Sequence, residues 1–271
     1  MSKKSYEIIT LGCNCEPRGY LTAWNLIPTK TKGRLSLPFD LSVHNIDIVN
    51  QLIKNNFSTY LDKLRYGYRS GNRYYWTNFD DEVIYYHDFH DKPHYHKKMI
   101  KRYSQRIKNF QKMSTSEHFV FFLINLDANS ATANDLNELY ENLKNYRQGQ
   151  EFALLAWDQY NLINHEELNR EIKIVSHRTP ESNSLNAWDV TRKKDSKLLE
   201  HDKILKEFVI NSIKEHGFEI KYYKLAMQDK IKYFLKYNLP KLFAITNNWI
   251  DNRKTLILFG KKINLWKLPE D

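Results

Sequence analysis

Short runs of apolar residues alternate along this chain with longer segments in which apolar residues recur every three or four positions. Runs of the first kind are typical of buried strands, and the second spacing is typical of amphipathic helices. The run Phe119-Val120-Phe121-Phe122-Leu123-Ile124 is apolar throughout and predicts a strand covered on both faces. Strands are predicted at 6–11, 74–76, 83–86, 118–125, 151–157, 171–176 and 218–223, and helices at 16–25, 45–57 (with Asn45 as its cap), 97–113, 133–146 and 203–216.

The alternation of buried strands with helices predicts an α/β fold, a Rossmann-like three-layer sandwich whose sheet is mainly parallel. We expect an α/β catalytic domain over residues 1–226. Residues 227–271 are basic and aromatic, and we expect them to form a C-terminal extension packed on that domain. The pattern does not define the architecture of this extension.

The turn after the first predicted strand carries both cysteines of the protein, Cys13 and Cys15, directly behind Gly12. Ligands bind beyond the carboxyl ends of parallel strands, which is where this turn lies. A helix N-terminus stabilises a thiolate and can lower a cysteine pKa below ~8.5. Cys15 is therefore the candidate nucleophile and Cys13 the weaker one, although free cysteines are also common as small buried side chains.

A cysteine nucleophile needs a base, usually a histidine that a third polar group orients. His87 follows the strand predicted at 83–86 and is our first choice, with Asp88 or Asp40 as the orienting carboxylate. His177 directly follows the strand predicted at 171–176 and is the second choice. The His- and Asp-rich segment 87–96 could instead bind a metal ion, but its spacing is not a zinc pattern and we expect none.

Other polar and aromatic residues could contact a substrate or its transition state. The Asn14 amide, with backbone N–H groups near residues 14–16, could stabilise an oxyanion. Asp40 could face the cysteine turn or simply cap the following helix, and Trp188 could contact substrate or belong to the core. The predicted substrate-binding residues are Gly12, Cys13, Glu16, Asp40, His177 and Trp188.

The net charge of +10, from 42 basic and 32 acidic residues, affects mainly the choice of partners. A basic surface attracts polyanions and anionic membrane surfaces. Because the basic residues are spread out and match no nucleic-acid motif, we expect no specific nucleic acid, and leave open a peripheral association with membranes. Two cysteines, no signal peptide and no long apolar run suggest a cytoplasmic protein. The sequence does not indicate an oligomeric state.

Several motifs together resemble a known family. In order along the chain they are Leu11-Gly12-x-Asn14-Cys15, Pro38-Phe39-Asp40, His87-Asp88-Phe89 and Tyr103-x-x-Arg106-Ile107-x-x-Phe110. They resemble a bacterial and viral family catalogued as papain-like cysteine peptidases of otherwise unknown function, over roughly residues 6–190. The resemblance implies a Cys-His pair of Cys15 and His87. Members usually carry Trp after Pro-Phe-Asp, where this chain has Leu41.

A weaker similarity is to capsule-polysaccharide acyltransferases, which bind coenzyme A and carry a Gly-Asn-Cys-Gln turn. Here Cys13 separates Gly12 from Asn14, and Glu16 takes the place of Gln. We therefore expect a cysteine hydrolase without a cofactor, acting through a thioester on a peptide, glycan or small molecule. The first alternative is a coenzyme A-dependent O-acetyltransferase of capsule or surface polysaccharide biosynthesis. The second is a non-catalytic protein that binds glycans or polyanions.

Overall fold

A computed structural model describes residues 5–70, 73–79, 82–85, 95–126, 131–178, 196–224, 243–248, 253–258 and 261–267. The chain divides into two compact units. The first comprises Met1–Ile27 and Arg34–Tyr222, and the second Pro28–Gly33 and Tyr223–Asp271. Our boundary after residue 226, and the packing of the extension on the catalytic domain, stay predictions.

A parallel sheet of four strands forms the centre of the first unit, in the order β1-β5-β6-β7. Its register places Ile9, Phe122, Leu154 and Ile172 side by side across the sheet. The middle strands are buried along almost their whole length, as expected for a parallel sheet covered on both faces. The strands are β1 (Tyr6–Thr10), β5 (Phe119–Asn125), β6 (Phe152–Asp158) and β7 (Ile172–Ser176).

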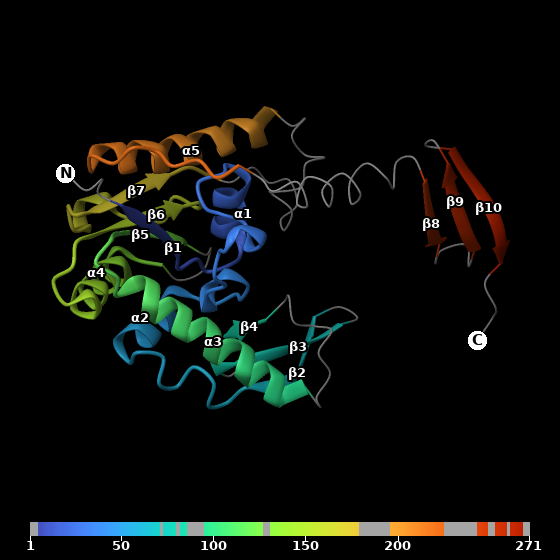
Figure 1. The fold of residues 1–271 in the computed structure, drawn as a ribbon, viewed down its shortest axis with the longest axis horizontal. Coiled ribbons are helices and arrows are strands. Elements are labelled where there is room, and N and C mark those ends of the chain that lie inside the picture. The colour runs from blue at the N-terminus through green and yellow to red at the C-terminus, as the bar shows by residue number, and fades with distance from the viewer. Residues whose placement is uncertain are drawn as a thin grey trace. The chain divides into compact units, whose positions relative to one another are not determined.

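Helices cover both faces of this sheet (Figure 1). On one face lie α2 (Ile46–Lys54), α3 (His96–Ser114) and α4 (Ala133–Arg147), and on the other α1 (Glu16–Ala23) and α5 (Ser196–Glu215). Neighbouring residues of β5 face opposite cores, Phe122 toward α3 and Phe121 toward α5. The predicted α/β class, with a mainly parallel sheet between two helical layers, is confirmed.

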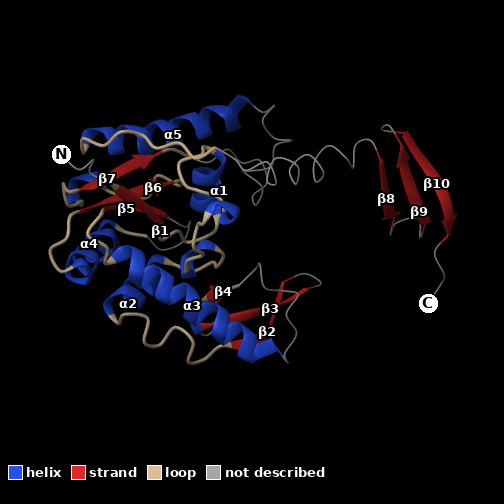
Figure 2. Ribbon diagram, viewed as in Figure 1, coloured by secondary structure: helices blue, strands red, loops and turns tan. Residues whose placement is uncertain are grey.

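A smaller antiparallel sheet in the first unit comprises β2 (Arg65–Ser70), β3 (Arg73–Asn78) and β4 (Val83–Ile84) (Figure 2). The hydrophobic pattern did not predict β2, because its sequence Arg-Tyr-Gly-Tyr-Arg-Ser contains no aliphatic residue. Gly67 lies at a register shift between Tyr66 and Tyr68, with φ at +145°, a conformation that favours glycine.

The strand predicted at 218–223 is wrong, because this segment joins no sheet. Phe218 is buried, but it packs its ring on Tyr6 and Phe121 at centroid distances of 5.4 and 5.9 Å. The backbone N–H of Lys221 donates to the Tyr6 hydroxyl rather than to a strand carbonyl. The apolar pattern therefore reflects side-chain packing without strand pairing. In addition, α5 begins at Ser196 rather than at 203.

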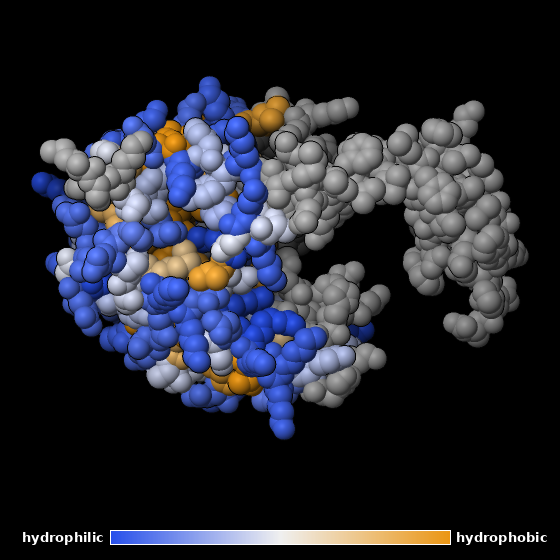
Figure 3. All heavy atoms as spheres, in the orientation of Figure 1, coloured by the Kyte–Doolittle hydropathy of each residue, from blue (hydrophilic) through white to orange (hydrophobic). Residues whose placement is uncertain are grey.

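The second unit contains an antiparallel sheet in the order β8-β9-β10, formed by strands β8 (Phe243–Asn248), β9 (Arg253–Leu258) and β10 (Lys261–Lys267). The register shifts between Asn264 and Trp266. The surface of the first unit that is visible in Figure 3 is mostly hydrophilic. Of the helices in the described parts of the chain, none is long and apolar enough to cross a membrane.

Candidate active site at the carboxyl end of the sheet

The cysteine turn continues the pairing of β1 with β5 beyond the end of β1. Leu11 N–H donates to Leu123 O at 2.8 Å, and Cys13 N–H donates to Asn125 O at 3.3 Å. The chain then leaves the sheet, and Cys15 becomes the N-cap residue of α1 with φ −82° and ψ 0°. Backbone pairing thus places Cys15 at the carboxyl end of β1, as the sequence predicted.

The two cysteines have different surroundings, and neither is in a disulfide. Cys13 is only 3% exposed and belongs to the core on the α2–α4 face of the sheet. Cys15 is only half-buried. This difference is consistent with Cys15 as the nucleophile and Cys13 as a packed side chain.

The Asn14 side chain connects the cysteine turn to the end of β5. Its Oδ1 accepts from Glu16 N–H at 2.8 Å and from Asn125 Nδ2 at 2.9 Å. Asn125 is the last residue of β5 and is 1% exposed. Asn125 was not predicted from the sequence. The available signal was a polar residue closing an otherwise apolar run.

A second contact connects the start of α1 to the end of β6. Gln159, which is buried and directly follows β6, donates from Nε2 to Glu16 Oε2 at 3.2 Å. The loop after β6 is held by the buried Asp158, whose carboxylate accepts from the N–H groups of Tyr160, Leu162 and Ile163. Glu16 therefore lies at the carboxyl edge of two neighbouring strands.

The pKa of the Cys15 thiol is raised above its ordinary value. The largest cause is burial, which disfavours the thiolate, and the negative charge of Glu16 adds to it. An interaction with the residue's own backbone N–H acts in the opposite direction. The direction is the opposite of the lowered pKa that we expected at a helix N-terminus, because burial and Glu16 raise it. Cys15 needs a base to become a thiolate near neutral pH.

Asp40 is completely buried beneath the cysteine turn. Its carboxylate accepts from Thr10 Oγ1 and from Leu37 N–H, both at 2.8 Å, and forms an ion pair with Arg18 of α1. Asp40 thus joins β1, α1 and the 3-10 turn Pro38–Asp40. It therefore connects residues on both sides of the cysteine turn, and both of its carboxylate oxygens are engaged by these partners.

His177 is the candidate base that the structure describes; His87, Asp88 and Trp188 lie outside the described residues. His177 directly follows β7, and its backbone N–H donates to the backbone oxygen of Asp158 at 3.1 Å. Its ring stacks on His201 of α5, with centroids 5.1 Å apart. His201 is completely buried, and burial together with repulsion from His177 lowers its pKa to about 4.

His44 is a further histidine near the turn, and it was not predicted from the sequence. Its backbone N–H donates to Cys13 O at 3.0 Å, and its ring lies 5.0 Å from that of Phe39. The residue is 2% exposed, and burial lowers the pKa of its imidazole to about 3. His44 is therefore neutral at ordinary pH and anchors the cysteine turn through its backbone.

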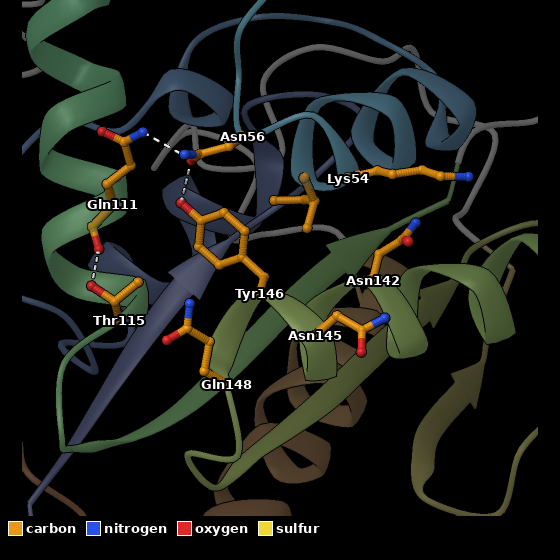
Figure 4. A pocket seen from close by; sticks show the side chains of 9 residues that line it. Lys54, Asn56, Gln111, Thr115, Asn142, Asn145, Tyr146 and Gln148 are labelled. Atoms are coloured by element: carbon orange, nitrogen blue, oxygen red, sulfur yellow. Dashed lines mark hydrogen bonds between the residues drawn. The ribbon is translucent and has the colours of Figure 1, made fainter.

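A hollow of about 680 Å³ lies elsewhere in the first unit, between α2, α3 and α4 (Figure 4). Tyr146 and Gln111 both donate to Asn56 Oδ1 there, at 3.2 and 2.9 Å. Several of its lining residues lie at the carboxyl ends of α3 and α4, shortly before β5 and β6 begin. The hollow therefore lies at the amino edge of the sheet. Cys15 lies at the opposite edge. This hollow is therefore separate from the cysteine site.

The candidate metal ligands of segment 87–91 also lie outside the described residues. Within the described part of the chain, no group of three or more His, Cys, Asp or Glu side chains is placed to hold a metal ion.

Fold and site together define an α/β protein with a half-buried cysteine at the start of the helix that follows the first strand. Residues 6–167 match the family described as "Putative papain-like cysteine peptidase (DUF1796)", and the chain belongs to this family. The match includes Cys15, Asp40, His87 and Asn125 but ends before His177. The family description indicates a cysteine hydrolase. No curated protein and no solved structure is significantly similar to the chain.

Proposed function

We propose that this protein is a cysteine hydrolase in which Cys15 attacks the carbonyl carbon of its substrate and forms a thioester. The observation that carries the proposal is the position of Cys15, half-buried at the N-cap of α1 and at the carboxyl end of β1. The contacts of Asn14 with Asn125 and of Glu16 with Gln159 hold this turn at the end of the sheet. A rigidly held nucleophile at such a turn is suited to acyl transfer.

The reaction begins when a histidine accepts the thiol proton and the thiolate attacks the carbonyl carbon. A carbon–sulfur bond forms, and the carbonyl oxygen becomes an oxyanion. The intermediate collapses, the leaving group departs with the proton from the imidazolium, and Cys15 is left as a thioester. Water, deprotonated by the same histidine, then attacks the thioester and releases the acid with free Cys15.

We propose His87 as this base and Asp88 as its orienting carboxylate, with His177 as the alternative. His87 lies within the residues that match the family, whereas His177 follows them. A base is required because burial and Glu16 raise the pKa of Cys15. The substrates that we propose are peptides or other small acyl compounds, bound without a metal or organic cofactor.

Acylation by p-nitrophenyl acetate, followed by intact-mass spectrometry, tests the proposal. The wild-type protein should gain one acetyl group and release p-nitrophenolate, and Cys15→Ser should lose this reaction. Cys13→Ser is the matched control and should keep it. His87→Ala should slow acylation strongly and His177→Ala should not, with the exposed His118→Ala as a control. Acylation that survives Cys15→Ser would overturn the proposal.

A second measurement distinguishes hydrolysis from transfer. We expect acetyl-coenzyme A to leave the melting temperature unchanged, because a hydrolase has no site for it. Strong stabilisation by acetyl-coenzyme A would instead favour an acyltransferase that uses the same cysteine.

A further inference from the structure

We propose that Asn125 positions the Asn14 amide so that Asn14 Nδ2 donates a hydrogen bond to the oxyanion formed at Cys15. This inference rests on the proposed function and assigns a second residue to it. Asn125 is then a positioning residue, because it acts through Asn14 rather than on the substrate.

The first argument is that few backbone donors of the cysteine turn can face a substrate. Cys13 N–H donates to Asn125 O, and Glu16 N–H donates to Asn14 Oδ1. Pro17 has no N–H. Of the backbone N–H groups near residues 14–16, those of Asn14 and Cys15 remain as candidate donors to an oxyanion. A side-chain donor beside Cys15 would add to the backbone donors of an oxyanion hole.

The second argument is that the hydrogen bonds of Asn14 allow one orientation of its amide. Its Oδ1 accepts from two donors, Glu16 N–H and Asn125 Nδ2. Rotating the Asn14 amide by 180° would turn its NH₂ group toward both of these donors. Oδ1 must therefore face the protein, and Nδ2 is left to donate elsewhere. Asn14 is only half-buried and is adjacent to Cys15 in the chain.

The third argument is that the Asn125 side chain carries an energetic cost. Its Oδ1 is buried and has no hydrogen-bond partner among the residues that the structure describes. A buried unpaired acceptor costs about 1–3 kcal/mol. The close approach of Gly12 to Oδ1 and the hydrogen bond from Nδ2 to Asn14 hold this amide in place. An asparagine kept at this cost is expected where its donor group has a specific task.

The test compares two reagents that modify the same thiol. p-Nitrophenyl acetate passes through an oxyanion, whereas iodoacetamide loses iodide in a direct displacement and forms none. Asn125→Asp has nearly the same shape, but a carboxylate cannot donate to Asn14 Oδ1. It would instead attract the Asn14 NH₂ group and turn the amide around.

We expect Asn125→Asp to slow acylation by about 10²-fold, the usual loss for one oxyanion donor. The iodoacetamide rate, compared at the high-pH plateau where the thiol is fully ionised, should change by less than about threefold because this reaction forms no oxyanion. Asn14→Asp is the second variant. Its carboxylate still accepts from Glu16 and Asn125 but cannot donate, so the same loss of acylation is expected in a folded protein.

Asn50→Asp is the matched control, because Asn50 is a buried asparagine of α2 that donates to Asp135 O and accepts from Asn142. It should leave the ratio of the two rates unchanged. Equal losses with both reagents, or no loss in Asn14→Asp, would overturn the role of Asn125 and Asn14. If wild-type Cys15 is not acylated at all, the proposed function itself fails, so the two failures are distinguishable.

Discussion

Gly12 lies so close to Asn125 that a Cβ built on the glycine would be 2.4 Å from Asn125 Oδ1. The same Cβ would be 2.7 Å from Pro17 Cγ and 2.8 Å from Asn14 O. Real Cβ atoms do not approach other atoms this closely, so position 12 requires glycine. The need arises from the crossing of the cysteine turn over the end of β5.

Gly12→Ala is expected to displace the turn, destabilising the protein by about 1–3 kcal/mol, as overpacking does, and abolishing acylation of Cys15. Urea unfolding and the p-nitrophenyl acetate reaction measure the two effects. Gly217→Ala is the control, because Gly217 has φ +78° but open space around it. It should lose stability through backbone strain and keep its acylation rate. A normal acylation rate in Gly12→Ala would show that the turn tolerates a Cβ.

Glu16→Gln is expected to increase the reactivity of Cys15. Removing the negative charge removes one of the causes that raise the pKa of the thiol, while the glutamine can still accept from Gln159. A lower pKa leaves more of the thiol ionised near pH 8, so the alkylation rate there should rise. Iodoacetamide alkylation as a function of pH measures it, with the exposed Glu141→Gln as control. An unchanged pH profile would mean that Glu16 does not affect the thiol.

Asp40→Ala is expected to destabilise the protein by about 3 kcal/mol, because it leaves Arg18, Thr10 and the Leu37 N–H without their buried partner. Urea unfolding measures the loss. Glu138→Gln removes an exposed ion pair with Lys54 and should cost less than about 1 kcal/mol. A small loss for Asp40→Ala would contradict the supporting role of this carboxylate.

The stability of the protein is expected to fall as the pH decreases below 6.5. The folded pKa of His44, about 3, lies below its ordinary value of 6.5, so the unfolded chain binds a proton before the folded chain does. At pH 5 this difference costs about 2 kcal/mol relative to neutral pH. His201, with a pKa of about 4, acts in the same direction.

The variant His44→Phe tests this origin. It should reduce the loss of unfolding free energy between pH 7.5 and pH 5 by about 2 kcal/mol. Each variant is compared with itself at two pH values, so any change in packing cancels. The exposed His118→Phe should leave the difference as in the wild type. An equally large loss in His44→Phe would assign the acid sensitivity to other groups.

Arg147→Lys is expected to cost about 2 kcal/mol, because a lysine cannot replace the several carbonyl contacts of the buried guanidinium. Arg147 donates to the carbonyls of Ser114, Ser116, His118 and Glu151, which surround the starts of β5 and β6. Thermal unfolding measures the loss, and the exposed Lys144→Gln is the control. Because Arg147 lies at the amino edge of the sheet, acylation of Cys15 should not change.

Much of the first unit could be predicted from local pattern. The helix that begins after Asn45 is an example, because Asn45 Oδ1 accepts from Ile48 N–H at 2.9 Å as a cap should. The apolar run of β5 likewise became a strand covered on both faces. By contrast, β2 was missed because sheet pairing, rather than hydrophobic alternation, defines it.

The candidate site divides in the same way. The order of strand, glycine, cysteine and helix involves residues that are close in sequence, and it was enough to place Cys15 at the N-terminus of α1. The partners of that turn are not local. Asn125 is 111 residues from Asn14, and Gln159 is 143 residues from Glu16. The pairing of β1, β5 and β6 brings them together. The sequence alone does not indicate that residues so far apart along the chain are in contact.

The sequence by itself determined the α/β class and the place of Cys15 at the end of the first strand, because hydrophobic spacing and turn residues act over a few positions. Only the tertiary structure decided the environment of that cysteine. Burial and the neighbouring Glu16 raise its pKa, although the isolated helix N-terminus predicted the opposite. The physical reason is that desolvation depends on everything packed around a group, and that packing exists only in the folded chain.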